Sequence, residues 1–160
     1  MTNLAQAIAD PNQPDAAYAG LEALVNETIG IKLFTLMELD FARGVAKRTY
    51  SNMPDAYPSS GEKPMQPGRW SEQVEGRHQS YVANSIEEIA EVFPDHELIQ
   101  SLGCESCLNL PIVAGGRLLG TLNCLNVAGH FTPERVAAAE TLKLPGAAVF
   151  LLANSLKKEG

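Results

Sequence analysis

The sequence predicts an α+β domain in which antiparallel strands are flanked by a helix toward each end of the chain. Apolar residues recur at helical spacing over about residues 15–29. Two strands over residues 107–126 are separated by a diglycine turn, which makes them the clearest hairpin of the chain. A Thr-Pro-Glu start, typical of a helix N-terminus, opens a last helical region over about residues 132–157.

The core of the fold is expected over residues 31–126, between the two terminal helices. Residues 31–39 are β-branched, aromatic and mostly apolar, as in a central strand, and residues 45–51 are expected to pair with them as a hairpin. Residues 51–69 contain four prolines and two glycines. Because this composition disfavours the interiors of helices and strands, it predicts an irregular excursion.

Short elements are expected after the excursion. Residues 70–79 can form a helix and residues 80–83 a strand. Ser85, with a glutamate three residues later, matches a capping box. Asp95 is predicted to cap a further short helix that Gly103 closes.

Length and charge limit the classes of protein to consider. The 160 residues fit one domain over 1–160, with enough apolar material for one core. A net charge of −7 and scattered basic residues disfavour nucleic acid and anionic lipid, both of which bind basic surfaces. We therefore expect neither nucleic acid nor a membrane as a partner.

The termini and the cysteines indicate a cytoplasmic protein. The first ten residues lack the features of a secretory signal. The longest apolar stretch, residues 144–153, is broken by Pro145 and Gly146 and is shorter than the ~20 residues that span a bilayer. The same Pro-Gly pair is expected to break or kink the last helix. Three cysteines are too few for a disulfide framework and are expected to be thiols.

Taken together, five segments resemble a GAF domain over about residues 15–155. They are Leu108-Asn109-Leu110-Pro111-Ile112, Gly115-Gly116, Leu118-Leu119-Gly120-Thr121-Leu122-Asn123, Gly129-His130-Phe131-Thr132-Pro133-Glu134 and Arg48-Thr49-Tyr50-Ser51. The resemblance implies an antiparallel sheet with the N- and C-terminal helices on one face. On the other face it implies a ligand pocket roofed by loops and short helices.

The resemblance also implies partners. GAF domains usually bind small molecules, commonly pair through their terminal helices, and in most cases precede a catalytic or DNA-binding module. We therefore expect a small-molecule ligand, a homodimer, and a separate output protein that receives the signal. The identity of the ligand or cofactor is not predicted.

The hairpin supplies four candidate ligand contacts. Strand alternation places Cys107 and Asn109 on one face of the first strand. On the second strand it places Thr121 and Asn123 together on one face, and the residues next to them in sequence on the other face. Asparagine is disfavoured in strands, and a buried amide must be hydrogen-bonded. The two amides can therefore orient a ligand or, alternatively, satisfy neighbouring backbone groups.

Three further candidates, Trp70, His78 and Tyr81, come from the segment that would cover the pocket. Aromatic side chains offer a ligand apolar contact and polar tips. The alternative for Trp70 is that it pins the long loop to the core. Arg69 and Arg77 can in principle pair with an anionic ligand, on weaker grounds.

Cysteine chemistry is the main alternative from another class of function. Cys104 and Cys107 have the spacing of a redox motif, but they precede a strand rather than a helix N-terminus that would lower a thiol pKa. The chain also differs from a GAF-type enzyme, the free methionine-R-sulfoxide reductase. At positions matching that enzyme's reactive and carboxylate residues it has residues 100–101, Cys107, Asn123 and Leu125. We assign no catalytic residue and expect no metal.

The sequence thus favours a sensory or regulatory domain, without catalysis of its own, that binds a small polar or aromatic metabolite by neutral contacts. Two alternatives stay open. One is a thiol-based redox enzyme or sensor that uses Cys104 and Cys107. The other is a protein-interaction module whose pocket is filled by its own side chains.

Overall fold

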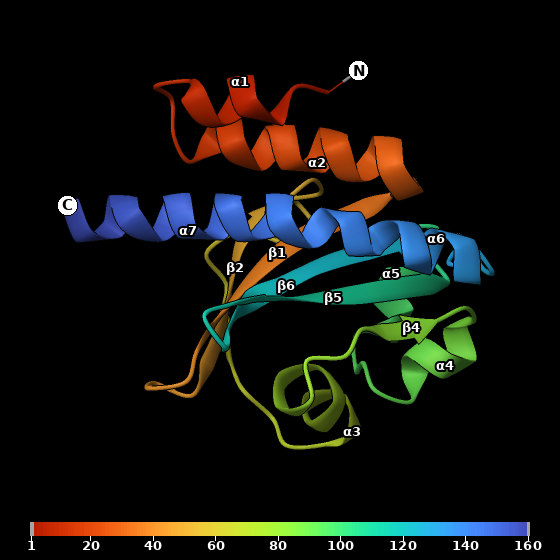
Figure 1. Ribbon diagram of the computed structural model, residues 1–160. Coiled ribbons are helices and arrows are strands. Elements are labelled where there is room, and N and C mark those ends of the chain that lie inside the picture. The colour runs from red at the N-terminus through yellow and green to blue at the C-terminus, as the bar shows by residue number, and fades with distance from the viewer. Residues whose placement is uncertain (1, 160) are drawn as a thin grey trace.

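A computed structural model, which describes residues 2–159, contains a six-stranded antiparallel sheet in the order β3-β2-β1-β6-β5-β4 (Figure 1). All five strand pairs are antiparallel. The strands are β1 (Leu33–Asp40), β2 (Val45–Ser51), β3 (Glu62–Pro64), β4 (Tyr81–Ala83), β5 (Ser106–Ala114) and β6 (Arg117–Asn126).

Helical segments cover both faces of the sheet (Figure 1). One layer contains α1 (Leu4–Ala9), α2 (Asp15–Ile29), α6 (Pro133–Ala139), a 3-10 turn η2 (Glu140–Leu142) and α7 (Lys143–Glu159). The opposite layer contains α3 (Arg69–Ser71), a π-helical turn η1 (Glu72–Gly76), α4 (Ile86–Ala90) and α5 (His96–Ser101). The α+β arrangement expected from the sequence is confirmed.

Strand alternation gives the β5–β6 hairpin two different faces. Leu108, Leu110 and Ile112 are completely or almost completely buried in the core beneath the helices. The residues that alternate with them along β5 point to the opposite layer. The turn is made by Gly115 and Gly116, both with positive φ (59° and 75°), as a two-residue type I′ connection requires.

Two glycines allow α7 to lie close to the sheet. A Cβ added to Gly146 would lie 2.9 Å from Ile112 Cδ1, and one added to Gly120 would lie 2.9 Å from the ring of Phe150. Phe150 itself is fully buried. The missing side chains therefore set the distance between the C-terminal helix and the hairpin.

The last helical region differs from the prediction at Pro145 and Gly146. The α-helix is interrupted earlier, by the 3-10 turn at Glu140–Leu142, and α7 then runs without a break from Lys143. Pro145 lies in the first turn of α7, where backbone N–H groups have no partner within the helix, so its missing N–H costs little. Two short elements, α1 and β3, were not predicted.

Helix caps follow the sequence signals in two cases out of three. Ser85 Oγ accepts from the backbone N–H of Glu88 at 3.2 Å, and Thr132 Oγ1 accepts from that of Arg135 at 3.3 Å. Asp95 stands at the N-cap of α5 but its side chain makes no capping bond. Its carboxylate instead accepts a hydrogen bond from the hydroxyl of Tyr57, a contact across the roof of the cavity described below.

The segment Pro133–Lys158 is long and apolar enough to cross a membrane by length and composition, with a mean hydropathy of 1.5. Its apolar character has an explanation in the fold. Val149 and Phe150 are fully buried against the sheet, and Ala153 is nearly so. One side of this segment therefore packs on the sheet, while Leu144 and Leu151 are exposed.

Candidate functional site

A cavity of about 460 Å³ lies between the sheet and the layer that contains α3. Its floor is formed by side chains of β1, β2, β5 and β6. Its roof and mouth come from residues 63–71 of the excursion and residues 91–95 after α4. The long irregular segment noticed in the sequence is therefore the cover of a cavity.

A row of polar side chains crosses the cavity floor. Asn109 on β5 lies directly opposite Asn123 on β6, which lies opposite Thr35 on β1. Opposite residues of an antiparallel sheet project from the same face, so the three side chains meet. Asn109 Nδ2 donates to Asn123 Oδ1 at 2.9 Å, and Asn123 Nδ2 donates to Thr35 Oγ1 at 3.2 Å.

Trp70 extends this row to the roof, because its Nε1 donates to Asn109 Oδ1 at 2.9 Å. The two amides are thus satisfied by side chains and not by neighbouring backbone, and Trp70 does pin the loop to the sheet. In these bonds each amide uses one of its two N–H groups and one of its two acceptor positions. One N–H group and one acceptor position of each amide take no part in these three bonds.

The structure brings together five of the seven candidate residues. Trp70, Cys107, Asn109, Thr121 and Asn123 line the cavity. Ligand contact by these five stays a prediction.

The other two candidates, Tyr81 and His78, do not line the cavity. Tyr81 is buried in β4, where its hydroxyl donates to the carbonyl oxygen of Glu88 at 3.3 Å and its ring meets Phe93 edge-on. His78 lines a different groove, described below.

Three residues absent from the candidate set also line the cavity: Arg48, Tyr57 and Asp95. The Arg48 guanidinium lies over the Tyr57 ring, 4.8 Å from its centroid, and its Nη1 donates to the carbonyl oxygen of Pro58 at 3.2 Å. Tyr57 in turn donates to Asp95. Alternation within residues 45–51 could have placed Arg48 on this face, but no local signal connects it to the distant Tyr57 and Asp95.

Two buried polar atoms of the cavity residues have no hydrogen-bond partner within residues 2–159. They are Nε of Arg48 and Oγ1 of Thr121. Burial lowers the pKa of the Arg48 guanidinium, because desolvation disfavours its charged form. A buried polar group without a partner is costly, so these two atoms are exceptions among the polar atoms of the cavity residues.

Two charged residues at the mouth of the cavity, Arg69 and Glu91, form an ion pair with each other. Arg69 Nη2 lies 2.8 Å from Glu91 Oε2, and both side chains are more than half exposed. Arg77, the other arginine considered from the sequence, lies outside the cavity and its Nε donates to Gln79 Oε1 at 3.3 Å. Neither is an unpaired cation that faces the interior.

The three cysteines are buried free thiols. Burial raises the pKa of Cys107 to about 12 and also raises the pKa values of Cys104 and Cys124. Because the thiolate is the nucleophile and the metal ligand, these environments suppress cysteine chemistry. No group of three or more metal-binding side chains occurs within residues 2–159.

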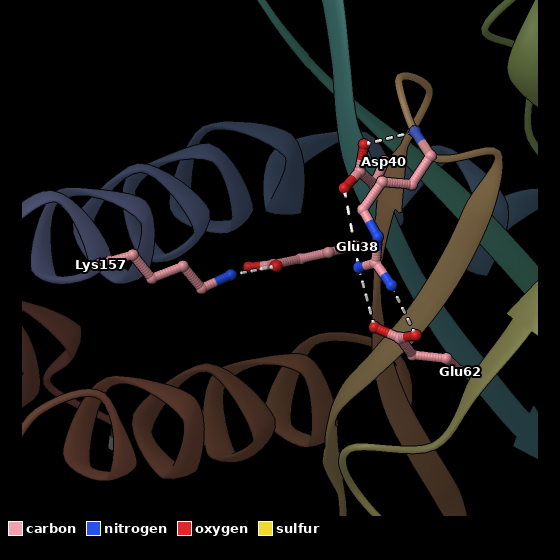
Figure 2. A network of polar contacts seen from close by, with 5 residues as sticks. Glu38, Asp40, Glu62 and Lys157 are labelled. Carbon is pink, nitrogen blue, oxygen red and sulfur yellow. Dashed lines mark hydrogen bonds and ion pairs between the residues drawn. The ribbon is translucent and has the colours of Figure 1, made fainter.

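A second hollow of about 570 Å³ lies near the other end of the sheet, and His78 lines it together with Phe41 and Arg117. At its edge Lys157 of α7 donates to Glu38 of β1 (Figure 2). Beside them Arg43 bridges to Glu62, with hydrogen bonds of 3.0 and 3.1 Å. The first contact ties the end of α7 to β1, and the second ties the β1–β2 turn to β3.

With this geometry in place, the comparison with protein families is decisive. The model of the GAF domain family matches residues 32–143. The chain belongs to the GAF domain family. Such domains generally bind small-molecule ligands in sensory proteins, and the cavity of this GAF domain lies almost entirely within the matched residues.

Solved structures share this fold at low sequence identity. The GAF domain of a phosphoenolpyruvate-protein phosphotransferase from Coxiella burnetii has a TM-score of 0.72 at 19% identity, covering 97% of this chain and 92% of that one. A domain of a putative two-component sensor histidine kinase from Sinorhizobium meliloti has a TM-score of 0.62 at 16% identity, covering 92% and 94%.

A third structural neighbour is an enzyme. Free methionine-R-sulfoxide reductase from Neisseria meningitidis, in complex with its substrate, has a TM-score of 0.65 at 16% identity, covering 96% of this chain and 87% of that one. At such identities the similarity shows the fold alone. No curated protein matches this chain.

Replacing Asn109 by alanine should loosen the roof of this GAF domain. The change leaves Trp70 Nε1 and the Asn123 amide oxygen without partners, and we expect a loss of about 1–3 kcal/mol in the free energy of unfolding. Trp70 is the only tryptophan. Its fluorescence should therefore shift to longer wavelength and become more accessible to acrylamide.

The matched control for this change is Asn154→Ala on α7, in the second hollow. It should leave both the fluorescence and the urea midpoint unchanged. Unaltered Trp70 emission in folded Asn109→Ala would contradict the role given to the polar row.

The thiols of the native protein should be unreactive. Because the pKa of Cys107 is about 12, only about 10⁻⁴ of it is thiolate at pH 8. Ellman's reagent should titrate essentially none of the three cysteines in native protein and all three in guanidinium chloride. Rapid labelling of one native thiol at pH 8 would restore the redox alternative.

Proposed function

We propose that residues 1–160 form a sensory or regulatory GAF domain that binds a small molecule in the cavity over the polar row. The observation that supports it most is the cavity itself. About 460 Å³ lies within the range of roughly 300–1,000 Å³ of small-molecule sites. Its lining combines apolar side chains and the rings of Tyr57, Trp70 and Phe93 with polar and charged groups that can orient a ligand.

The same features argue against the two alternatives. A thiol-based redox enzyme or sensor needs an accessible thiol with a lowered pKa, whereas burial raises the pKa of all three cysteines. An interaction module with a self-filled pocket would have no cavity of this size. Ligand binding without catalysis by the domain is therefore the function that the geometry favours.

The terminal helices support a homodimer as part of this proposal. Leu144 and Leu151, two helical turns apart on α7, are 80% and 50% exposed. An exposed apolar stripe beside α2 suits a helix-to-helix contact between two copies. We further propose that the domain is cytoplasmic and signals to a separate output protein.

Thermal-shift screening of a metabolite library tests the ligand-binding proposal. At least one compound class should raise the melting temperature of the wild type. The same hits should lose most of their effect on Trp70→Ala and Asn123→Ala, because these residues form the roof and the floor. Phe41→Ala, an exposed aromatic residue in the second hollow, is the control and should respond like wild type.

Two outcomes would contradict the proposal. In one, no library compound stabilises the wild type. In the other, the hits stabilise both cavity variants as strongly as they stabilise the wild type, which would place their site elsewhere.

The dimer is tested by one charge placed on α7. Leu151→Glu should sediment as a monomer at a concentration where wild type is a dimer, because a carboxylate in an apolar contact loses its solvation. Val127→Glu, a substitution of a 49% exposed residue outside the terminal helices, should stay dimeric. A monomeric wild type at high micromolar concentration would exclude this dimer.

A further inference from the structure

We infer that the ligand is a small aromatic carboxylate whose anionic group binds Arg48. This inference rests on the proposed function and departs from the neutral recognition expected from the sequence. It names a chemical class, an aromatic ring with one carboxylate, and a direction of binding across the cavity floor.

The first step is the electrostatic state of Arg48. Its Nε is buried and has no partner, while Nη1 donates only to a backbone carbonyl oxygen. No ion pair joins Arg48 to a carboxylate within residues 2–159, whereas Arg43 and Arg69 are both paired. The Asp95 carboxylate acts on Arg48 without forming an ion pair, so a partly buried guanidinium is left that favours direct contact with an anion entering from the cavity.

The second step concerns the acidic residues that line the cavity with Arg48. Asp95 also lines the cavity, but its carboxylate accepts the hydroxyl of Tyr57 and forms no ion pair with Arg48. Glu91 is paired with Arg69 at the mouth. Glu75 is a third acid of the lining, and burial raises its pKa. Lys63 adds one more cation to the lining. Arg48 and Lys63 are thus the two cations of the lining that form no ion pair within residues 2–159, although the charge of the Asp95 carboxylate still acts on Arg48.

The third step is the distance to the second unpartnered atom. Arg48 lies opposite Met37 on β1, and Met37 lies opposite Thr121 on β6. Two strand spacings separate Arg48 from Thr121, roughly 10 Å between their Cα atoms. A ligand that reaches from the guanidinium to the Thr121 hydroxyl must therefore cross the apolar side chain of Met37.

The last step is the nature of the part that crosses. The lining contains Met37 on the floor and two aromatic rings from the roof, Trp70 and Phe93, whose centroids lie 6.4 Å apart in an edge-on contact. These surfaces suit a flat aromatic body. A ring with a carboxylate at one end and a hydroxyl at the other would meet Arg48, the apolar middle and Thr121 in that order.

The test compares carboxylates with their neutral isosteres. The probes are benzoate, phenylacetate, 4-hydroxyphenylacetate and indole-3-acetate, each paired with its primary amide, with tyramine as a cationic analogue. Calorimetry on wild type should show at least one acid bound tenfold or more tightly than its amide. In Arg48→Met the ratio of amide to acid dissociation constants should fall to about one. Arg69→Met, which removes the arginine at the mouth of the cavity, is the control and should retain the wild-type ratio.

Two further measurements refine the geometry. Arg48→Lys keeps the charge but loses the planar fork, so it should retain an intermediate preference for the acid. Thr121→Val should weaken 4-hydroxyphenylacetate several-fold and leave phenylacetate unchanged. The comparison of acid with amide on wild type needs no variant, so the inference is testable even if Arg48→Met does not fold.

The outcomes separate this inference from the proposed function. Acids that bind no tighter than their amides to wild type, or an acid preference that persists in folded Arg48→Met, overturn the inference. If neutral or cationic library compounds bind in the cavity while the carboxylates do not, the inference fails and the proposed function stands. If neither the library nor the probes bind, both fail.

Discussion

The burial of the central strands on both faces is the constraint on which the rest of this GAF domain depends. Side chains of β1, β5 and β6 alternate between the two layers, so each strand must supply a core surface and a cavity floor at once. On the core side, Gly120 and Gly146 bring α7 close enough to seal the apolar face. On the other side, the residues between these core positions become the floor of the cavity.

The polar row solves a problem that this double burial creates. Amides within buried strands are costly unless each finds a partner, and here Asn109 and Asn123 find one another, Thr35 and the indole of Trp70. The row therefore holds an irregular roof at a fixed height above the sheet. Among the cavity residues, Nε of Arg48 and Oγ1 of Thr121 are exceptions to this pattern, since neither has a hydrogen-bond partner within residues 2–159.

The family relation and the site geometry carry different information. One GAF fold accommodates a phosphotransferase domain, a sensor kinase domain and a reductase among its structural neighbours, so the fold alone selects no chemistry. In this chain the deciding features are local. Cys107 lies in the cavity wall, yet its burial raises the pKa to about 12, whereas Arg48 forms no ion pair within residues 2–159 and its Nε has no hydrogen-bond partner there.

The sequence by itself determined what depends on neighbouring residues: the faces of the β5–β6 hairpin, its diglycine turn, and the caps at Ser85 and Thr132. It also identified five residues that line the cavity, because period-two alternation and one long irregular segment suffice to find a floor and a roof. Contacts between distant residues were decided only by the tertiary structure. Asp95 gives its carboxylate to Tyr57 in place of its own helix, and His78 faces another hollow. The isolation of Arg48 likewise follows from which side chains the fold places around it, and no local pattern encodes that arrangement.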